Sequence, residues 1–598
     1  MIDYDNVKNL PSMFFDQAAR LKDAPFLWSK KDGQWLSQSW SQVADETNRL
    51  SRGLRAKGVK PGDRVLLLSE NRPKWLMADV AIMATGAITT PAYTTNTEAD
   101  HLHILHDSGA RVAIVSTAKL AKRFLPAAVQ AGLDLVIVME EPDNRPGQSL
   151  HIETWDDMLA LGAEQPDDVM DLVNAQKRGD TCCIIYTSGT SGTPNGVMLS
   201  HGAIISNCMG AEDVLQHLPG YGEAPEVFLS FLPLSHSYEH TAGQFVPVAW
   251  GAQIYYAESI DKLINNIAEV RPTIMVSVPR LYETIRGRVL KGAEQADGLK
   301  AKMLYKAVEL GAKAYQDPKS LTFTERLLNR LLDKLVRRKV QERFGGRLKA
   351  FVSGGGPLNY DVGLFFLALG LRVLQGYGQT ESAPVAAVNR CELNDLCTVG
   401  PPMKDVEVKI AEDGEILIRG ELVMNGYWKQ PERTAEVIID GWLHTGDIGE
   451  LNENGYLKIT DRKKDIIVNS GGDNISPQRV EGILCLEPEI EQCMIYGDNR
   501  PHLVGIIVPN QEFIETWCKE NNVDPKTLTA DDKAFKSAIH AAVDRANKKM
   551  SVIEKVRRFA LVMEPFSVEN EMLTPSMKVR RHVVKHTYGQ VLNDLYKK

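Results

Sequence analysis

One stretch, IYTSGTSGTPNGVMLSHG at residues 185–202, says most about the architecture of this chain. Its centre is a run of threonine, serine and glycine between two apolar segments. Gly189, Gly192 and Gly196 let backbone N–H groups approach an anion closely, and the neighbouring hydroxyls add donors. We expect a strand before this loop and a helix after it, which together favour a phosphate-binding loop. A serine- and glycine-rich surface loop is the alternative.

Composition limits the classes of protein that the chain can represent. Its 598 residues are enough for more than one domain. With 69 Lys+Arg against 77 Asp+Glu, the net charge of −8 argues against a nucleic-acid binder. The eight cysteines form no C-x-x-C pair, so we expect neither a zinc site nor a disulfide framework. Neither a signal peptide nor a membrane-spanning segment is expected, and a cytoplasmic location is predicted.

The first 400 residues alternate between helical and strand patterns. Short apolar runs at 63–69, 111–116, 272–279 and 348–355 are typical of buried strands, and helical spacing separates them. This alternation predicts an α/β fold with parallel-type sheets covered by helices. Loops at the carboxyl ends of such strands are the usual ligand-binding positions.

Beyond residue 400 the pattern changes to short strands. Residues 406–420 predict a hairpin that turns at Asp413-Gly414, and residues 449–472 predict further short strands. We therefore predict a small β-rich subdomain at the end of a large N-terminal domain, residues 1–462. A small, mobile α+β domain, residues 463–598, is predicted to follow.

A second segment, LQGYGQTES at 374–382, carries residue types suited to a nucleotide. Tyr377 can stack on a base, Thr380 can reach a phosphate, and the carboxylate of Glu381 can hold Mg²⁺. A tight turn with a core tyrosine is the alternative.

Together these segments resemble the adenylate-forming superfamily, which includes acyl-CoA synthetases, peptide-synthetase adenylation domains and firefly luciferase. Residues 185–202 resemble its phosphate loop, and GYGQTES resembles its second nucleotide motif. Three further motifs follow in the family's order: LHTGDIG (443–449), DRKKDIIVNSGGDNISPQRVE (461–481) and LTPSMKVRR (573–581). The resemblance extends from about residue 45 to residue 581.

Within the superfamily, residues 440–464 resemble the fatty acyl-CoA synthetase signature, and residues 231–243 and 278–285 resemble its long-chain branch. The resemblance implies an enzyme that joins a fatty acid to coenzyme A with ATP and Mg²⁺. The carboxylate would attack the α-phosphate and release pyrophosphate. The thiol of CoA would then displace AMP from the acyl-adenylate.

The resemblance also assigns roles in the nucleotide site. The residues implied to hold the β- and γ-phosphates are Thr187, Ser188, Gly189, Thr190, Ser191, Gly192, Thr193 and Asn195. Those implied to line the adenine and α-phosphate are Gly354, Gly355, Gly356, Tyr377, Gly378 and Thr380. Glu381 and Thr187 are implied to hold Mg²⁺.

Further roles follow from the later motifs. Asp447 would accept both ribose hydroxyls, because a carboxylate accepts without donating. Arg462 would place a cation near the ribose and phosphates, and His236 would lie where the acyl and CoA paths meet. Lys464 matches the family's hinge, and Gly471 and Gly472 would face the CoA thiol.

Lys578 matches the mobile catalytic lysine of the family's small domain. Attack on the α-phosphorus gathers negative charge, which a cation stabilises more in the transition state than in the ground state. A solvated surface lysine is the alternative for this position.

Asn195 departs from the family pattern, which usually shows Pro-Lys-Gly where this chain has Pro194-Asn195-Gly196. An amide brings no charge, and charge-assisted hydrogen bonds are roughly twice as strong as neutral ones. We expect either weaker ATP binding or compensation from another cation nearby.

A predicted helical segment at 321–349 is amphipathic and basic. Residues 325–349 contain nine Lys/Arg and three Asp/Glu, a local net charge of +6. One face is expected to hold Leu327, Leu328, Leu331, Leu332, Leu335 and Val336. Such a helix either lies on an anionic membrane surface or packs its apolar face against the core.

Three alternatives to a long-chain fatty acid–CoA ligase remain at this point. The acceptor could be an acyl carrier protein, or the acid could be medium-chain or aryl. A chain of another class would be a non-catalytic nucleotide- or acyl-binding relative, which Asn195 alone favours. A homodimer is expected only by analogy with the family.

Overall fold

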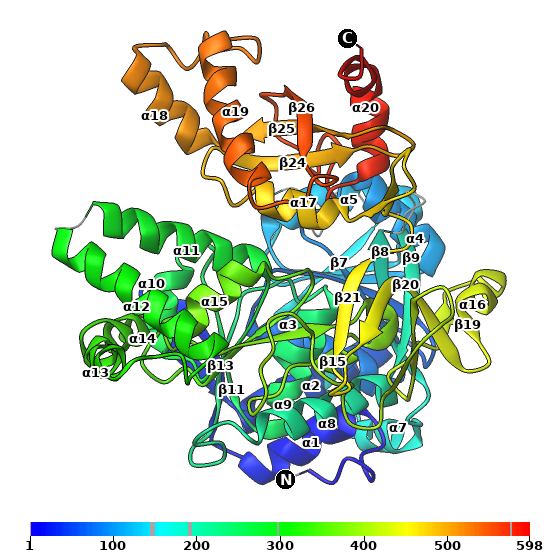
Figure 1. The fold of residues 1–598 in the computed structure, drawn as a ribbon. Coiled ribbons are helices and arrows are strands. Elements are labelled where there is room, and N and C mark those ends of the chain that lie inside the picture. Colours follow the sequence, from blue (N-terminus) through cyan, green and yellow to red (C-terminus); the bar gives the residue numbers. More distant parts are fainter. Residues whose placement is uncertain (1, 144–149, 189–193, 296–297, 575–576, 598) are drawn as a thin grey trace. The chain divides into compact units, whose positions relative to one another are not determined.

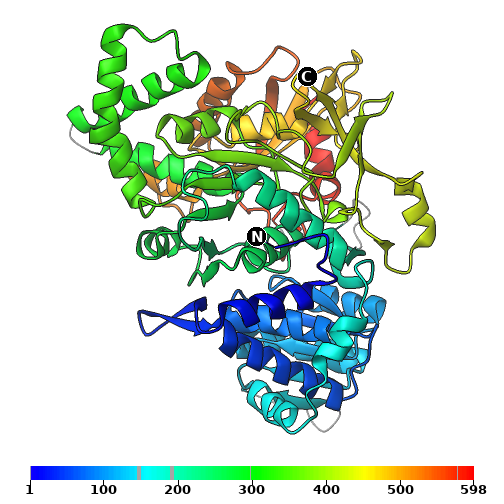
Figure 2. The same ribbon diagram turned by 90° about the horizontal axis from the view of Figure 1, so that it is seen from below.

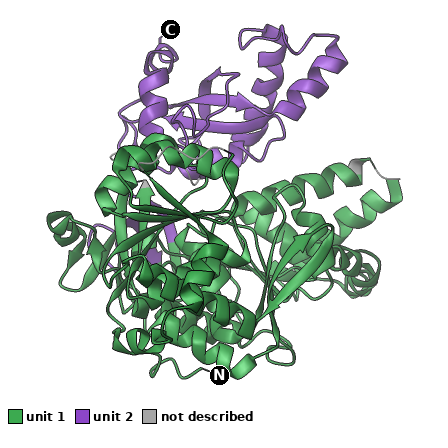
Figure 3. Ribbon diagram, turned by 180° about the vertical axis from the view of Figure 1, so that it is seen from behind, with its two compact units in different colours: residues 1–409, 417–445, 451–458 green, residues 410–416, 446–450, 459–598 purple. Residues whose placement is uncertain are grey.

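The computed structural model describes residues 2–143, 150–188, 194–295, 298–574 and 577–597. Contacts divide the chain into two compact units (Figure 3). The first unit comprises residues 1–409, 417–445 and 451–458, and the second comprises 410–416, 446–450 and 459–598.

One eight-stranded sheet of the first unit has the order β18-β9-β8-β4-β3-β5-β6-β7. Its strands are β3 (Arg64–Leu68), β4 (Ile88–Ala92), β5 (Val112–Val115), β6 (Leu135–Val138), β7 (His151–Thr154), β8 (Thr181–Ser188), β9 (Pro194–Ser200) and β18 (Gly426–Tyr427). Neighbours from β8 to β7 run parallel, whereas β8, β9 and β18 pair antiparallel. The predicted strands at 63–69 and 111–116 are confirmed as β3 and β5.

Helices accompany this sheet in the blue-to-cyan part of Figure 2. They are α1 (Leu10–Leu21), α2 (Trp40–Ala56), α3 (Pro73–Ala84), α4 (Glu98–Ser108), α5 (Ala118–Ala131), α6 (Trp155–Ala163), α7 (Val169–Ala175) and α8 (His201–Leu215). Leu105 of α4 and Phe124 of α5 belong to the core beneath β3 and β5. The strands are apolar on both faces because helices cover a parallel sheet on both sides.

The other eight-stranded sheet has the order β15-β14-β13-β12-β10-β11-β1-β2. Its strands are β1 (Pro25–Lys31), β2 (Gln34–Ser39), β10 (Val227–Ser230), β11 (Gln253–Tyr256), β12 (Ile274–Ser277), β13 (Ala350–Ser353), β14 (Val373–Tyr377) and β15 (Ala387–Val388). Only the edge strands β2 and β15 pair antiparallel. The predicted strands at 272–279 and 348–355 are confirmed as β12 and β13.

Helical segments connect the strands of this sheet (Figure 1). They are the π-helical turn Glu239–Phe245, α9 (Val246–Trp250), α10 (Leu263–Val270), α11 (Pro279–Glu294), α12 (Gly298–Gln316), α13 (Phe323–Leu332), the π-helical turn Asp333–Arg337, α14 (Arg338–Arg343), α15 (Tyr360–Ala368) and the 3₁₀ turn Thr380–Ser382. The helical character predicted for residues 321–349 is confirmed by α13 and α14.

Short strands follow, as the sequence predicts. Four of them form the order β16-β17-β20-β19, and β21 pairs with β20. The bounds are β16 (Glu407–Ile410), β17 (Glu415–Arg419), β19 (Ile438–Ile439), β20 (Trp442–Leu451) and β21 (Leu457–Arg462), with α16 (Pro431–Val437) before β19. The predicted hairpin at 406–420 is confirmed, and Gly414 has φ +84° at its turn.

The second unit is an α+β module around the sheet β24-β25-β26. Its elements are β22 (Ile467–Val468), β23 (Asn474–Ile475), α17 (Pro477–Leu484), β24 (Ile490–Tyr496), β25 (Leu503–Pro509), α18 (Gln511–Asn521), α19 (Lys533–Asn547), β26 (Val556–Leu561) and α20 (Arg581–Asp594). Ile507 packs with Trp517 and Phe535, and Ile506 packs with Val584 in a separate cluster. Alternating strand residues therefore serve two cores.

Across the described ranges, no helix combines the length and the apolar character needed to cross a bilayer.

The π-helical turn Glu239–Phe245 carries buried ionisable groups next to β10. Ser230 Oγ donates to Glu239 Oε1 at 2.6 Å, and His240 Nε2 lies 2.8 Å from Asp79 Oδ2. Burial raises the pKa of Glu239 from 4.5 to about 8. The folded protein thus keeps this carboxyl protonated at neutral pH, whereas the unfolded chain ionises it.

This difference predicts a pH-dependent stability. Between pH 4.5 and about 8 the folded state holds the proton more tightly, so Glu239 lowers the free energy of unfolding as pH rises. The slope is at most about 1.4 kcal/mol per pH unit. Glu239→Gln removes this pH dependence. The melting temperature of the variant, relative to that of the wild type at the same pH, should therefore rise from pH 5 to pH 8.

The exposed Glu453 supplies the matched control, because Glu453→Gln should follow the wild type across the same pH range. A constant difference between Glu239→Gln and the wild type at every pH would contradict the raised pKa.

Candidate nucleotide and acyl-transfer site

The predicted phosphate loop joins two antiparallel strands. Thr187 lies opposite Asn195 in the β8–β9 register, at the end of the hairpin next to the connecting loop. Ser188 is the last residue of β8. Outside the described residues lie Gly189, Thr190, Ser191, Gly192 and Thr193.

The helix expected after this loop exists, but it begins later than the sequence predicts. Residues 194–200 form β9, and α8 begins only at His201, where Ser200 Oγ accepts from Ala203 N. Val197 and Leu199 are buried in the sheet, so strand pairing and burial override the helical pattern. Hairpin backbone, and not a helix N-terminus, therefore frames the loop.

Asn195 is 5% exposed and contacts a cation that the sequence did not reveal. Its Oδ1 accepts from Arg433 Nη1 at 2.8 Å and from Gln430 Nε2 at 3.1 Å. Arg433 lies on α16, far along the chain from Asn195. A cation therefore lies beside the asparagine, where the second of the two expectations requires one.

A tyrosine connects this cation to Glu381. The guanidinium of Arg433 lies over the ring of Tyr427, 5.0 Å from its centroid. Tyr427 Oη donates to Glu381 Oε1 at 2.9 Å. β18, which contains Tyr427, pairs with β9 so that Tyr427 lies opposite Val197. Asn195, Arg433, Tyr427 and Glu381 thus form one continuous cluster in the first unit, which we call the Asn195 cluster.

The adenine and α-phosphate candidates follow the ends of neighbouring strands. Val352 pairs with Leu374 in the parallel β13–β14 register, so the loops after both strands leave the same edge of the sheet. Gly354, Gly355 and Gly356 follow β13, and Tyr377 ends β14.

Two glycines among these candidates have no room for a side chain. A Cβ on Gly378 would lie 1.9 Å from Pro384 O, and one on Gly354 would lie 2.8 Å from the Tyr238 ring. Thr380 Oγ1 lies 3.1 Å from Ser237 Oγ, which brings the loop after β10 to the same edge. The structure thus gathers these predicted residues into one region.

Polar groups in this region suit a phosphate ester and Mg²⁺. Gln379 Nε2 is a buried donor without a hydrogen-bond partner among the described residues. No group of three His, Cys, Asp or Glu side chains arranged to hold a metal occurs in the described part of the chain. Mg²⁺ is commonly held by one or two carboxylates together with substrate phosphates and water. Glu381 fits that requirement when a nucleotide supplies the remaining ligands.

His236 lies in the loop after β10 and is partly buried. Tyr238 N donates to His236 Nδ1 at 3.2 Å, and the ring of Tyr93 meets the imidazole edge-on at 6.4 Å. Because Nδ1 accepts this backbone hydrogen bond, the neutral imidazole of His236 carries its proton on Nε2.

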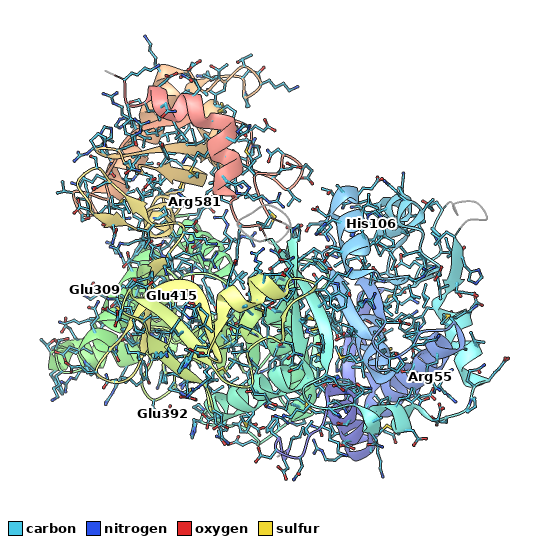
Figure 4. All side chains as sticks on the ribbon, turned by 90° about the vertical axis from the view of Figure 1, so that its right-hand side faces the viewer. Arg55, His106, Glu309, Glu392, Glu415 and Arg581 are labelled. Carbon is cyan, nitrogen blue, oxygen red and sulfur yellow. The ribbon has the colours of Figure 1, made fainter. Side chains whose placement is uncertain are left out.

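The second unit contains the ribose candidates. Arg462 Nε donates to Asp447 Oδ1 at 3.1 Å, and the carboxylate of Asp447 is 8% exposed. Glu415 (Figure 4) accepts from Gly446 N at 2.8 Å and from Lys463 Nζ at 3.0 Å. Sequence reasoning missed Glu415, which orients the backbone next to Asp447.

The hinge and CoA candidates occupy turns of the second unit. Lys464 is exposed in the turn after β21, where Asp465 N donates to Arg462 O. Gly471 and Gly472 lie between β22 and β23, and Gly472 has φ +86°. Asn469 Oδ1 accepts from Gly471 N at 2.9 Å and shapes this turn.

Lys578 is exposed, and its backbone closes a short loop. Thr574 N donates to Lys578 O at 2.8 Å, and Lys578 N donates to Thr574 Oγ1 at 3.0 Å. Arg581, the first residue of α20 (Figure 4), donates from Nη1 to Glu481 Oε1 at 2.6 Å. Arg581 Nη2 also donates to Ile495 O. This part-buried ion pair holds the start of α20, three residues after the lysine.

Two protein-family models together match almost the whole chain. Residues 14–428 match the AMP-binding enzyme model, and residues 464–598 match the AMP-binding enzyme C-terminal domain. The chain therefore belongs to the AMP-binding enzyme family, and its predicted membership in the adenylate-forming superfamily is confirmed.

Curated relatives match over most of their length. Long-chain-fatty-acid–CoA ligase FadD15 of Mycobacterium bovis is 31% identical, covering 99% of this chain and 97% of the relative. Long chain acyl-CoA synthetase 4 of Arabidopsis thaliana is 31% identical, covering 95% of this chain and 88% of the relative.

Solved structures share the fold. The adenylation domain of a carboxylate reductase from Mycobacterium chelonae has a TM-score of 0.74 at 23% identity, covering 99% of this chain and 91% of that one. The corresponding domain from Segniliparus rugosus, in complex with AMP and a co-purified carboxylic acid, has a TM-score of 0.75 at 20% identity, covering 98% of this chain and 94% of that one. The predicted α/β fold class with a smaller C-terminal domain is confirmed.

The Arg581–Glu481 pair predicts a specific loss of stability. Arg581→Gln leaves the part-buried Glu481 carboxylate without its cation, which lowers the free energy of unfolding by about 1–3 kcal/mol. The melting temperature of the second unit should fall, as measured by calorimetry on the full chain.

Lys548→Gln, at an exposed position on the same unit, is the control and should melt with the wild type. Replacing both partners, Arg581→Met with Glu481→Gln, should recover part of the loss. An unchanged transition in Arg581→Gln would show that the pair does not anchor α20.

Proposed function

We propose that this chain is an ATP-dependent, AMP-forming ligase that converts a long-chain fatty acid into its CoA thioester. The observation that carries the proposal is the full-length likeness to long-chain-fatty-acid–CoA ligases. The arrangement of the site supports it, because strand-end glycines, the carboxylate of Glu381 and the guanidinium of Arg433 lie in one region of the first unit.

The proposed reaction has two steps. A carboxylate oxygen of the fatty acid attacks the α-phosphorus of ATP, and the bond to pyrophosphate breaks. The sulfur of CoA then attacks the acyl carbonyl carbon, the thiol loses its proton, and the bond to AMP breaks.

Residues of the first unit hold the nucleotide in this proposal. The backbone around Thr187 and Asn195 binds the β- and γ-phosphates, and Gly354–Gly356 and Tyr377 receive the adenine. Thr380 contacts the α-phosphate. Glu381 and Thr187 would hold Mg²⁺, which would supply neutralisation of the phosphate charge when bound.

Arg433 takes the part of the missing loop lysine. Its Nη1 is held by Asn195 Oδ1, and it forms no ion pair with a carboxylate among the described residues, so its charge remains to be neutralised. A guanidinium binds phosphate oxygens through two parallel N–H groups, which suits this role. Asn195 favoured a non-catalytic relative because it removes a positive charge from the loop. Arg433 supplies a positive charge at the same place, so this argument for a non-catalytic relative is weaker.

Residues of the second unit complete the proposed chemistry. Asp447 accepts the ribose hydroxyls, and Arg462 adds a cation. Lys578 stabilises charge on the α-phosphate during the first step. Lys464 is the hinge, and Gly471 and Gly472 face the thiol of CoA during the second step. The N-terminal domain of this proposal is 1–462 and the mobile domain is 463–598.

The remaining assignments are also part of the proposal. The partners are fatty acid, ATP and CoA, with contact between the protein and the inner face of a membrane, and the location is cytoplasmic. His236 lines the junction of the acyl and CoA paths. A homodimer is proposed by analogy with the family alone.

Lys578→Ala tests the catalytic assignment. We expect pyrophosphate release with palmitate, ATP and Mg²⁺ to fall by about 10²–10³-fold, the usual loss when one charge-stabilising group is removed. Transfer from a supplied acyl-adenylate to CoA should persist, because that step does not use the lysine.

Lys585→Ala, on the exposed side of α20, is the matched control and should keep wild-type release. Wild-type release by Lys578→Ala would remove the lysine from the mechanism. Failure of the wild-type protein to release pyrophosphate with any fatty acid would overturn the proposed function.

Arg433→Ala tests the phosphate cation. The KM for ATP should rise about tenfold or more, as loss of a charge-assisted hydrogen bond predicts, while the KM for fatty acid stays the same. Asn195→Lys alone should also weaken ATP binding, because it buries a second cation beside Arg433. The double variant Asn195→Lys with Arg433→Ala should recover ATP affinity.

Glu436→Ala, at an exposed position of α16, controls for changes in the helix itself. An ATP KM in Arg433→Ala equal to that of the wild type would rule out the cation role.

A further inference from the structure

The helix α13 presents an apolar face to solvent. Its exposed apolar side chains are Phe323 (83% exposed), Leu327 (64%), Leu328 (37%) and Leu331 (51%), followed by Leu335 (41%) in the π-helical turn. We call these five residues the leucine face. Isolated exposed leucines are ordinary, but five that are neighbours on one helix indicate an interaction surface.

The leucine face is not the side that anchors the helix. Leu332 is 3% exposed and packs with Leu310 and Leu321, and Val336 packs against the same cluster. The expectation that Leu332 and Val336 share a face with the other leucines is therefore wrong. The helix has two apolar sides, and the core uses only the smaller one.

A buried arginine completes the anchor. The side chain of Arg337 donates to Ala368 O at 2.6 Å, to Ala307 O at 2.7 Å, and to the backbone and side-chain oxygens of Asn329. It also pairs with Asp333 at 2.6 Å. Because Leu332, Val336 and Arg337 hold the helix, packing within the first unit does not explain the leucine face.

A hollow of about 1050 Å³ runs along the leucine face. Leu327, Leu328 and Leu331 line it together with the basic side chains Lys334 and Arg338. The two helices α13 and α14 lie at the edge of the first unit in Figure 1. Apolar side chains and cations thus share one outer surface.

The cations around this face are not neutralised by the protein. Arg330, Lys334 and Arg338 are exposed, and none of them forms an ion pair with another residue in the described part of the chain. Residues 325–349 carry a net charge of +6 in a chain whose total is −8. The segment is therefore a basic patch on an acidic protein.

We propose that the leucine face docks on the surface of an anionic lipid bilayer. The leucines enter the boundary between headgroups and acyl chains, and Arg330, Lys334 and Arg338 contact the lipid phosphates. The helix lies in the plane of the surface. A long-chain fatty acid partitions into bilayers, so this contact places the enzyme where its substrate is held, a consequence that rests on the proposed function.

Vesicle flotation with the full chain tests the docking directly. The wild type should float with vesicles that contain phosphatidylglycerol, bind vesicles of phosphatidylcholine alone more weakly, and detach as salt is raised. Leu327→Ser with Leu331→Ser should weaken binding to the anionic vesicles by about tenfold or more. Lys334→Gln with Arg338→Gln should weaken the same binding by about tenfold or more.

Two control variants match these changes. Leu36→Ser removes a leucine on β2 that is also 51% exposed, so it pairs with Leu331→Ser. Lys119→Gln with Lys122→Gln removes two exposed cations from one turn of α5. Both controls should float as the wild type does, and melting temperatures of all variants should agree because the altered side chains are exposed.

Several results would overturn the proposal. One is wild-type protein that does not bind anionic vesicles. Another is flotation of the leucine variants that equals that of the wild type. Self-association that Leu331→Ser abolishes, with flotation unchanged, would assign the face to a second copy of the chain. Flotation needs no catalysis, so failure of the docking and failure of the proposed ligase activity are told apart.

Discussion

Hydrogen bonding between β12, β13 and β14 is the constraint on which the candidate site depends. Ser277, Ser353 and Gln375 lie in one register across the three strands, so the loops that follow them start from the same edge. The chain reaches this edge again through Ser237, whose hydroxyl meets Thr380. Parallel pairing therefore gathers motifs that are distant in sequence at one edge of the sheet.

Much of this arrangement could be predicted from the sequence. Buried strands such as β3 and β13 are short apolar runs bounded by glycine or proline, a local signal that survives folding. The turn at Gly414 is equally local. The helix expected after Gly196 begins only at His201, because residues 194–200 join a sheet. Sheet pairing depends on a partner strand that no local pattern contains.

The contacts that sequence could not supply are those across long separations. Arg433 belongs to the short charged helix α16, and only the fold brings it to Asn195. Glu415 is one acidic residue among many until Gly446 N and Lys463 reach it. The leucine pattern of α13 predicted a single apolar side, whereas Leu332 and Leu331 face different surroundings. Amphipathic spacing gives a side of a helix but not what covers it.

The way in which Arg337 holds α13 has a mechanical consequence. Apolar contacts have little directionality, so a helix held by them alone tolerates rotation about its long axis. Hydrogen bonds from the Arg337 guanidinium to Ala307, Asn329 and Ala368 are directional, so they fix the rotation of the helix about its own axis. A force that would rotate α13 about its axis is therefore transmitted to α12 and α15, which contain Ala307 and Ala368. The helix does not rotate independently of them.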